Sequence, residues 1–338
     1  MGRCARPLNR LTHAIGRDSG AIIRFDTAIG SDNLGDNIIM HYCGRVLEEL
    51  FPNHEKLSIP THLMPTPEQE LSVSRHKYKF VCGTNLLTSQ IEHHWRWILP
   101  DGIRRKFRFR NALLLGVGWG EYQAACSDYS RMVYNVMLNP SLTHSVRDQY
   151  TLEKLRGAGI RNVINTGCPT TWALTPEFCK AIPTGKAKDV VTTITDYRRD
   201  PAHDNEMLRI LSRSYDHVYL WLQGKWDEEY LHTLEIPHNL TTIPASLAAY
   251  EEVLARGGVD YVGTRLHAGI HALNYRIRSI ILAVDNRATE MGRDVNLPVI
   301  QRTDAGSELE EMIHSDFATE IRLNQENIDR FKAQFRRS

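Results

Sequence analysis

Short apolar runs alternate with amphipathic segments along most of the chain. Residues 77–83 (KYKFVCG) and 111–118 (NALLLGVG) form nearly continuous apolar runs bounded by glycine or polar residues, which is typical of strands buried on both faces. Residues 37–50 (NIIMHYCGRVLEEL) instead carry their apolar positions at helical spacing. Strands that alternate with helices in this way predict parallel sheets with helices on both faces.

This alternation occurs twice, which predicts two Rossmann-like domains that face each other across a cleft. The first series begins with a strand at 21–27 (AIIRFDT), and the second begins with a strand at 189–196 (DVVTTITD). Residues 175–188 contain two prolines, a glycine and three lysines, and they predict a linker between the two series. The predicted parts are a flexible basic leader, an N-terminal domain, the linker, a C-terminal domain and a polar helical tail on the surface: residues 1–20, 21–174, 175–188, 189–305 and 306–338.

Composition and charge narrow the class of protein. The chain has 338 residues, 42% of them hydrophobic, and its 41 basic residues nearly balance 40 acidic ones. This balance gives no support to nucleic-acid binding. The six cysteines are scattered without a Cys-x-x-Cys pair, which favours reduced thiols over a disulfide framework or a cysteine-rich zinc site. No apolar run reaches membrane-spanning length and the leader lacks the apolar core of a secretory signal, so we expect a cytoplasmic protein.

Polar side chains gather where predicted strands end, which is where ligands bind in open α/β sheets. The loop after the first strand (TAIGSDNLGD, 27–36) places Asn33, Gly35 and Asp36 at a turn into a helix. Its sequence matches neither the dinucleotide-binding fingerprint nor the P-loop. Asp36 therefore has two interpretations at this point, a helix cap or a residue of a binding site.

A second candidate is Arg147, which ends the strand predicted within 143–148. Arginine is rare inside a strand unless it is paired or holds an anion, so Arg147 predicts either an anion site or a salt bridge to Asp148. The loop at 196–199 (DYRR) also follows a strand. There we favour a solvated loop over a binding site.

The segment 261–275 (YVGTRLHAGIHALNY) combines a cation with two imidazoles at a strand-to-helix junction. Arg265 lies at the predicted N-terminus of the helix, which favours an anion. Arg147, Arg265 and His267 together predict a pocket for a small anion with several charges, because guanidinium groups bind carboxylate or phosphate and imidazole transfers protons near neutral pH. His267 and His271 are spaced like zinc ligands, but the glutamate of the His-Glu-x-x-His motif is missing. We expect His271 to pack within the helix and no metal to bind.

Residues 103–110 (IRRKFRFR) form a cluster of five cations with aromatic residues between them. A solvated face is the first interpretation of this cluster. Peripheral contact with the inner face of the membrane is the second, because basic and aromatic side chains together bind anionic lipid. Stacking on nucleic acid is a third, less favoured interpretation.

Three parts of the chain resemble the polysaccharide pyruvyl transferase family. They are GSDNLGDNII (30–39), SVRDQYTLEKLRGAGI with NTGCPTTWAL (145–174), and DYVGTRLHAGIHALNYRIRSIILAVDN (260–286), and the resemblance extends over about residues 22–302. The Arg-Leu-His-Ala element after a strand ending in Val-Gly is the most specific of them. The resemblance implies a fold similar to that of glycosyltransferase-B enzymes. It also implies transfer of a pyruvyl ketal from phosphoenolpyruvate to two sugar hydroxyls, without a cofactor.

The resemblance implies a donor site on the C-terminal domain. Arg147, Arg265 and Leu266 would bind phosphoenolpyruvate. Arg287 would also bind the donor, as a cation that replaces the lysine which the family often has after the preceding strand. His267 would act as general acid and protonate the methylene carbon of the donor.

The same resemblance implies an acceptor site on the N-terminal domain. Asn33, Gly35 and Asp36 would bind a sugar of a cell-surface or exopolysaccharide glycan, or its lipid-linked precursor, and Asp36 would orient or deprotonate it. The loop at 82–90 (CGTNLLTSQ) departs from the glycine-rich run that the family often has there. Two alternatives stay open: a glycosyltransferase of the same fold that uses a nucleotide sugar, and a non-catalytic glycan-binding protein of a biosynthetic complex. No nucleic-acid partner is expected.

Overall fold

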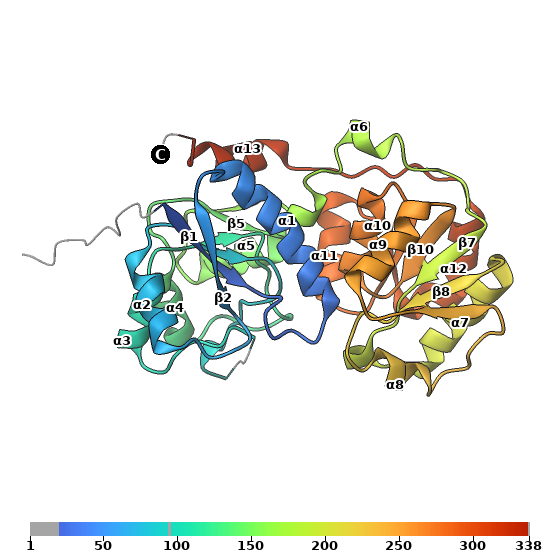
Figure 1. The fold of residues 1–338 in the computed structure, drawn as a ribbon, viewed down its shortest axis with the longest axis horizontal. Helices are drawn as coiled ribbons and strands as arrows, with labels where there is room; N and C mark the ends of the chain where they lie inside the picture. Colours follow the sequence, from blue (N-terminus) through green and yellow to red (C-terminus); the bar gives the residue numbers. More distant parts are fainter. Residues whose placement is uncertain (1–19, 94–95, 337–338) are drawn as a thin grey trace, which may run out of the picture.

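The computed structural model describes residues 20–93 and 96–336, so the predicted leader, apart from Gly20, lies outside the described residues. The chain is a mixed α/β protein, and all strand pairs in its described sheets are parallel. Figure 1 shows two groups of strands flanked by helices, one formed by the earlier and one by the later part of the sequence. The prediction of parallel sheets in a Rossmann-like α/β fold is confirmed.

The first sheet consists, in spatial order, of β2 (Glu55–Pro60), β1 (Ala21–Asp26), β3 (Lys79–Cys82) and β4 (Ala112–Leu115). A two-stranded sheet of β5 (His144–Val146) and β6 (Val163–Asn165) continues it beyond β4. The Gly116 amide donates to the Ser145 carbonyl (3.0 Å), and the Arg147 amide donates to the Val117 carbonyl (3.1 Å). These bonds bring the end of β5 beside the ends of β3 and β4.

The helices around the first sheet follow the predicted alternation. The Asn33 side chain caps the first of them by accepting from the Gly35 amide (3.0 Å), and the Asp148 side chain caps the helix after β5 by accepting from the Thr151 amide (2.7 Å). The helices are α1 (Leu34–Leu50), α2 (Pro67–Arg75), α3 (Ile103–Lys106), α4 (Asp128–Met137) and α5 (Gln149–Gly157), with 3₁₀ turns η1 (Ile91–His93), η2 (Phe107–Phe109) and η3 (Pro169–Thr171). A short helix, α6 (Pro176–Cys179), lies within the predicted linker.

The second sheet has six strands, in the spatial order β12 (Val299–Gln301), β11 (Ser279–Ala283), β10 (Val259–Gly263), β7 (Asp189–Thr192), β8 (Val218–Trp221) and β9 (Leu240–Ile243). The chain runs outward from β7 to β9 and then returns to β10, so the order reverses between β7 and β10. Ligands of open parallel sheets bind at such a reversal. The helices are α7 (Pro201–Ser214), α8 (Asp227–Leu231), α9 (Leu247–Arg256), α10 (Leu266–Asn274), α11 (Asn286–Val295) and α12 (Ala305–His314), with 3₁₀ turns η4 (Asp196–Arg198) and η5 (Arg302–Asp304).

The helix α13 (Gln325–Ala333) lies within the predicted helical tail, and one of its faces is packed against the first sheet. It lies beside α1 over the first sheet (Figure 1), and its Phe331 side chain is fully buried. Phe331 and Phe335 pack in one cluster with Phe51 and Phe80. Phe331 lies in α13 and Phe335 in the turn that follows it, and the many polar residues around them concealed this short apolar surface in the sequence.

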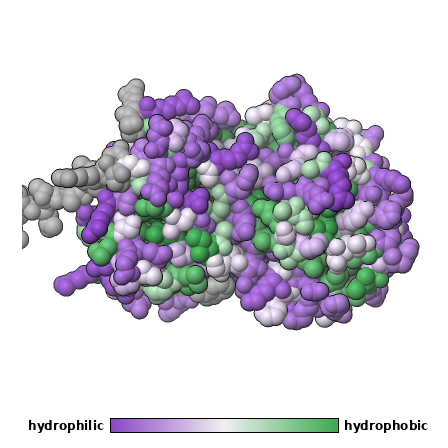
Figure 2. All heavy atoms as spheres, viewed as in Figure 1, coloured by the Kyte–Doolittle hydropathy of each residue, from purple (hydrophilic) through white to green (hydrophobic). Residues whose placement is uncertain are grey.

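The surface carries few extended apolar regions on the face drawn in Figure 2, where hydrophobic residues form separate patches among hydrophilic ones. No helix among residues 20–93 and 96–336 is long and apolar enough to cross a membrane. The cations of 103–110 are partly engaged inside the protein. Arg105 and Arg108 both bind the buried Glu70 carboxylate, and Lys106 donates to a backbone carbonyl (2.7 Å). This favours the solvated-face interpretation, and membrane contact stays a prediction.

Candidate active site

A pocket of about 680 Å³ lies at the carboxyl ends of strands from both sheets. Segments that follow β1 to β4 line one side of it, and segments that follow β7, β8 and β11 line the other. Three residues of the predicted site line this pocket: Asn33, Asp36 and Arg287. The remaining ones do not line it: Gly35, Arg147, Arg265, Leu266 and His267.

The loop between β1 and α1 is tied to the loop after β8 by two backbone hydrogen bonds of 2.9 and 3.1 Å. The Asn33 Oδ1 atom, which caps α1, also accepts a hydrogen bond from the Gln223 side chain (2.7 Å). A Cβ on Gly35 would lie only 2.9 Å from this Gln223 amide nitrogen, which explains the glycine. Asn33 and Gly35 therefore have structural roles, and acceptor binding by them stays a prediction.

Asp36 lies in the first turn of α1, and its interpretation as the helix cap is wrong because Asn33 is the cap. The Asp36 residue is 7% exposed, and its Oδ2 atom accepts a hydrogen bond from the Ser31 hydroxyl (2.6 Å). The Nε2 atom of His62 lies 3.9 Å from the same oxygen. Burial raises the pKa of Asp36, and the Ser31 hydrogen bond and the nearby His62 oppose this rise. The carboxyl group is thus held in the pocket wall, where it can orient a neighbouring polar group.

Arg147 follows β5 and is buried, with 1% of its surface exposed. Its Nε atom donates to the Asp148 carboxylate (3.3 Å), so the predicted salt bridge is present, and its Nη2 atom donates to the Asn85 side-chain oxygen. Its Nη1 atom has no hydrogen-bond partner among the described residues. Gly118 makes room for this guanidinium, because a Cβ there would overlap it. Arg147 is therefore paired and still keeps one N–H group that can bind an anion.

Arg265 immediately precedes α10, is 2% exposed and has more partners than Arg147. Its Nε atom donates to the Ile194 carbonyl (2.8 Å), and its Nη2 atom donates to the carboxylates of Asp227 (2.6 Å) and Asp196 (3.0 Å). Gly224 leaves space for the guanidinium, which a Cβ would overlap. The Nη1 atom has no partner within the part of the chain that the structure describes. Two carboxylates thus compensate Arg265, so it offers an anion one N–H group rather than a free fork.

His267 lies in the first turn of α10, next to the buried Leu266, with its Nε2 atom 3.8 Å from the Cys168 Sγ atom. Burial, followed by the positive charges of Arg147 and Arg287, holds the pKa of His267 well below its usual value. The imidazole is therefore neutral at neutral pH. An anion that offsets the two guanidinium groups would raise the pKa of His267 again.

Arg287 lies at the start of α11 and pairs with Asp285. Burial raises the pKa of Asp285, but Arg287 outweighs burial and lowers it to about 2. The Tyr197 hydroxyl accepts a hydrogen bond from Arg287, and its ring centroid lies 5.8 Å from the guanidinium carbon of Arg287 and 5.0 Å from that of Arg265. The first residues of the loop 196–199 thus line the pocket, while Tyr197 to Arg199 are exposed as the solvated-loop prediction expects.

The part of the chain that contains these residues matches a known protein family. A family model described as polysaccharide pyruvyl transferase matches residues 33–286. The chain belongs to the polysaccharide pyruvyl transferase family. The matched region includes every residue of the predicted site except Arg287, which follows it directly. A comparison with curated proteins finds no match.

A polysaccharide pyruvyl transferase acts on a saccharide, and the pocket has walls that suit one. Its lining combines charged side chains with Tyr197 and Trp226, which are 49% and 52% exposed. Tyrosine and tryptophan present an apolar ring together with a polar group, so they can contact both the C–H groups and the hydroxyls of a sugar. Both aromatic residues follow strands of the second sheet.

Several residues at this candidate site were not predicted from the sequence, among them His62, Asn85, Cys168 and Trp226. His62 and Asn85 follow β2 and β3, so the rule that selected Arg147, a polar residue after a strand, would have found them. Cys168 also follows a strand, but a small thiol in an apolar setting is usually part of a core. Its contact with His267 depends on packing between segments 99 positions apart.

His271 belongs to a different environment from His267. Its Nδ1 atom lies 2.9 Å from the Tyr42 hydroxyl, and its Nε2 atom lies 3.2 Å from the Glu251 carboxylate. Burial and the nearby His41 lower the pKa of His271 to about 4. The prediction that His271 packs within the helix is confirmed.

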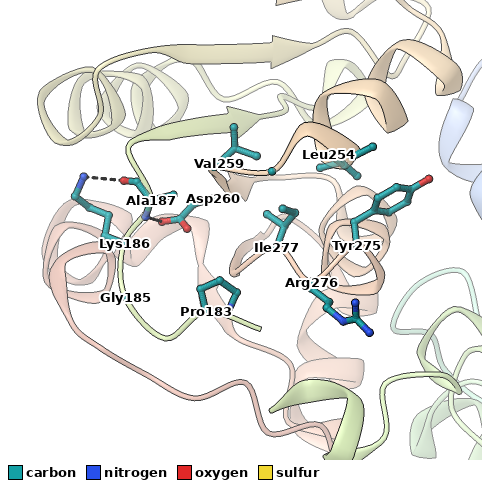
Figure 3. Close-up of a pocket in the computed structure, with 13 residues that line it drawn as sticks. Pro183, Gly185, Lys186, Ala187, Leu254, Val259, Asp260, Tyr275, Arg276 and Ile277 are labelled. Carbon is teal, nitrogen blue, oxygen red and sulfur yellow. Dashed lines mark hydrogen bonds between the residues drawn. The ribbon is translucent and has the colours of Figure 1, made fainter. Parts of the chain in front are cut away.

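Another pocket, of about 440 Å³, lies where β7 and β10 begin, at the amino ends of the strands of the second sheet (Figure 3). Two of its charged side chains, Lys186 and Asp260, are already paired. Lys186 donates to two backbone carbonyls (3.1 and 2.7 Å), and Asp260 accepts from Tyr215 and Arg278 (2.8 Å each). The pocket at the carboxyl ends of the strands is therefore the candidate active site of the pyruvyl transferase.

Proposed function

We propose that this protein transfers a pyruvyl group from phosphoenolpyruvate to two hydroxyls of a sugar, as a cyclic ketal. The acceptor is a sugar of a cell-surface or exopolysaccharide glycan, or its lipid-linked precursor. The observation that carries the proposal is that Arg147 and Arg265 each keep one buried guanidinium nitrogen without a partner among the described residues. An unsatisfied buried donor costs about 1–3 kcal/mol. A donor substrate with a phosphate and a carboxylate would satisfy both nitrogens.

The proposed architecture has two Rossmann-like domains that face each other across the pocket, as in glycosyltransferase-B enzymes. Residues 21–174 form the acceptor domain, residues 175–188 the linker and residues 189–305 the donor domain. The lining of the pocket by segments from both sheets supports this arrangement. The activity belongs in the cytoplasm, at the inner face of the membrane where the acceptor is lipid-linked.

In the proposed mechanism, Arg147, Arg265 and Arg287 hold the donor, with Leu266 as an apolar neighbour. The negative charge of phosphoenolpyruvate offsets the guanidinium groups that lower the pKa of His267, so His267 takes up a proton as the donor binds. His267 then protonates the methylene carbon. A sugar hydroxyl attacks the resulting cation at C2, phosphate leaves, and the second hydroxyl closes the ketal. The acceptor lies against Asn33, Gly35 and Asp36, and no step needs a metal or cofactor.

The donor is tested by thermal denaturation with phosphoenolpyruvate, UDP or CMP in parallel. A ligand at 100 times its Kd stabilises a protein by about 2.7 kcal/mol, so phosphoenolpyruvate should raise the Tm while the nucleotides leave it unchanged. Stabilisation by UDP or CMP alone would contradict the proposed donor and favour a nucleotide-sugar-dependent glycosyltransferase.

The reaction is tested by incubation with phosphoenolpyruvate and a panel of glycans. We expect acceptor-dependent release of phosphate together with the added mass of one pyruvyl ketal on one of the glycans. Binding of phosphoenolpyruvate without either product on any glycan would favour a non-catalytic glycan-binding protein.

A further inference from the structure

His62 is a titratable residue of the pocket that does not belong to the proposed donor-binding residues. It lies two residues after β2, lines the pocket together with Asp36, and has 20% of its side chain exposed. Its Nε2 atom lies 3.9 Å from the Asp36 Oδ2 atom, and its Nδ1 atom has no hydrogen-bond partner among the described residues. The imidazole is therefore placed beside a carboxylate on one side and is open to a substrate on the other.

Ketal formation requires a group that accepts protons from the acceptor. Two sugar hydroxyls each lose a proton, the methylene carbon gains one, and phosphate leaves as HPO₄²⁻ with the other. His267 lies near Arg147 and Arg287, where it can serve the donor. A second group must therefore serve the hydroxyls, and an imidazole is suited to this because it titrates near neutral pH.

We propose that His62 is the general base that deprotonates the acceptor hydroxyls, and that Asp36 is a positioning residue that orients His62. This assignment rests on the proposed pyruvyl transfer. The Nδ1 atom takes the hydroxyl proton, and the Asp36 carboxylate, 3.9 Å from Nε2, stabilises the imidazolium that forms. The Ser31 hydroxyl holds this carboxylate in place through a hydrogen bond of 2.6 Å. An imidazole oriented by a carboxylate is a recurring arrangement for a base that activates a hydroxyl.

The protons balance over the two steps of the reaction. In the first step the hydroxyl oxygen bonds to C2 while its proton moves to His62, and His267 protonates the methylene carbon. The bond between C2 and the phosphate oxygen then breaks with its electron pair on the phosphate, and His62 returns its proton so that HPO₄²⁻ leaves. Neutral His62 next takes the proton of the second hydroxyl as that oxygen bonds to C2. This proton passes to solvent while His267 takes one up, which restores both groups.

The charged groups around His62 determine how its activity depends on pH. Among the described residues, Asp36 faces the ring from α1, and Arg96 lines the same pocket. Asp26, at the end of β1, accepts a backbone hydrogen bond from Thr61 (3.1 Å), directly before His62. A base must be neutral to act, so the test follows kcat/KM for the acceptor as a function of pH.

The test compares His62→Gln and His62→Ala with Asp36→Asn, using phosphoenolpyruvate and the methyl glycoside that the wild type converts fastest. The glutamine keeps a polar side chain but does not titrate, so kcat should fall by about 10²–10⁴-fold and the acidic limb of the pH profile should disappear. Asp36→Asn should lower kcat/KM for the acceptor and keep that limb, because the imidazole is still present. The affinity for phosphoenolpyruvate should stay unchanged in each variant. His238→Gln, at an exposed histidine before β9, is the matched control and should behave as the wild type.

Three results would overturn the assignment. His62→Gln with wild-type turnover and an intact acidic limb would exclude His62 as the base and leave pyruvyl transfer standing. Loss of phosphoenolpyruvate binding in His62→Gln would show that the residue serves the donor or the fold instead. A wild-type protein that neither binds phosphoenolpyruvate nor releases phosphate would overturn the proposed function, and this assignment with it.

Discussion

Two buried arginine–aspartate pairs in the second sheet allow stability and activity to be separated. Arg265 pairs with Asp227 (2.6 Å) at the carboxyl ends of the strands, and Arg278 pairs with Asp260 (2.8 Å) where the strands begin. None of the four side chains is more than 2% exposed. The first pair lies at the candidate active site and the second at the pocket of Figure 3. Replacing each aspartate by asparagine removes one charge and almost no volume.

The structure sets the expected cost of each replacement. The Asp227 carboxylate accepts from Arg265 and from three backbone amides (2.7, 3.0 and 3.2 Å), so an asparagine must turn its NH₂ group toward another donor. Removing one partner of a buried ion pair costs about 3–5 kcal/mol. Because Asp196 still binds Arg265, Asp227→Asn should lower the free energy of unfolding by about 3 kcal/mol. Arg278 keeps three backbone carbonyls and the Phe317 ring but no second carboxylate, so Asp260→Asn should lower the free energy of unfolding by about 4–5 kcal/mol.

These free energies of unfolding correspond to measurable shifts in Tm. An unfolding entropy of about 2.1 cal/mol/K per residue amounts to about 0.7 kcal/mol/K for a chain of this length, so Tm should fall by about 4 °C in Asp227→Asn and about 6 °C in Asp260→Asn. Urea denaturation followed by circular dichroism measures the free energies, and phosphoenolpyruvate-dependent phosphate release measures kcat and KM. Only Asp227→Asn should raise KM for phosphoenolpyruvate, because only this variant removes one of the two carboxylates that position the Arg265 side chain.

Two outcomes would refute the reasoning about these pairs. Wild-type stability of Asp227→Asn would show that the Asp227 carboxylate does not compensate the buried charge of Arg265. Equal rises in KM in both variants would show that lost stability, rather than the position of Arg265, controls donor binding.

Three further predictions concern single side chains. His267→Gln should lower kcat by about 10²–10⁴-fold with unchanged circular dichroism, and turnover near that of the wild type would remove His267 from the mechanism. Burial lowers the pKa of His144 to about 4, below its unfolded value of about 6.5, so the stability it contributes is complete above about pH 6.5 and is lost as the pH falls toward 4. His144→Gln should flatten that part of the pH–stability curve in urea denaturation, and an unchanged slope would contradict this. Phe331→Ala should cost about 3–5 kcal/mol, and a loss below about 1 kcal/mol in the same assay would show that α13 docks weakly.

Local patterns were sufficient to predict most elements of the sheets. The apolar runs at 77–83 and 111–118 contain β3 and β4, whose residues are all buried. An arginine that ends an apolar run is also a local signal, and it identified Arg147 and Arg265 before their surroundings were known. A strand that is buried on both faces appears in the sequence as consecutive apolar residues, and its end appears as a change to polar residues.

Pairings between distant segments could not be predicted. Arg265 meets Asp227, which lies 38 positions earlier, because β8 and β10 lie on either side of β7. His62 meets Asp36 because β2 pairs with β1, although the two residues belong to different loops. The order of strands in a sheet decides which loops become neighbours, and this order depends on the packing of the whole sheet. The sequence therefore indicated charged residues of the site but not which of their charges are already compensated.

The docking of α13 has a consequence for the protein during synthesis. Residues 325–333 leave the ribosome after the whole second sheet, yet they cover Phe51 and Phe80 of the first. A nascent or truncated chain without α13 exposes this aromatic surface, and exposed apolar surface is what chaperones and proteases recognise. The sheet that is translated first is thus the one whose core is completed last.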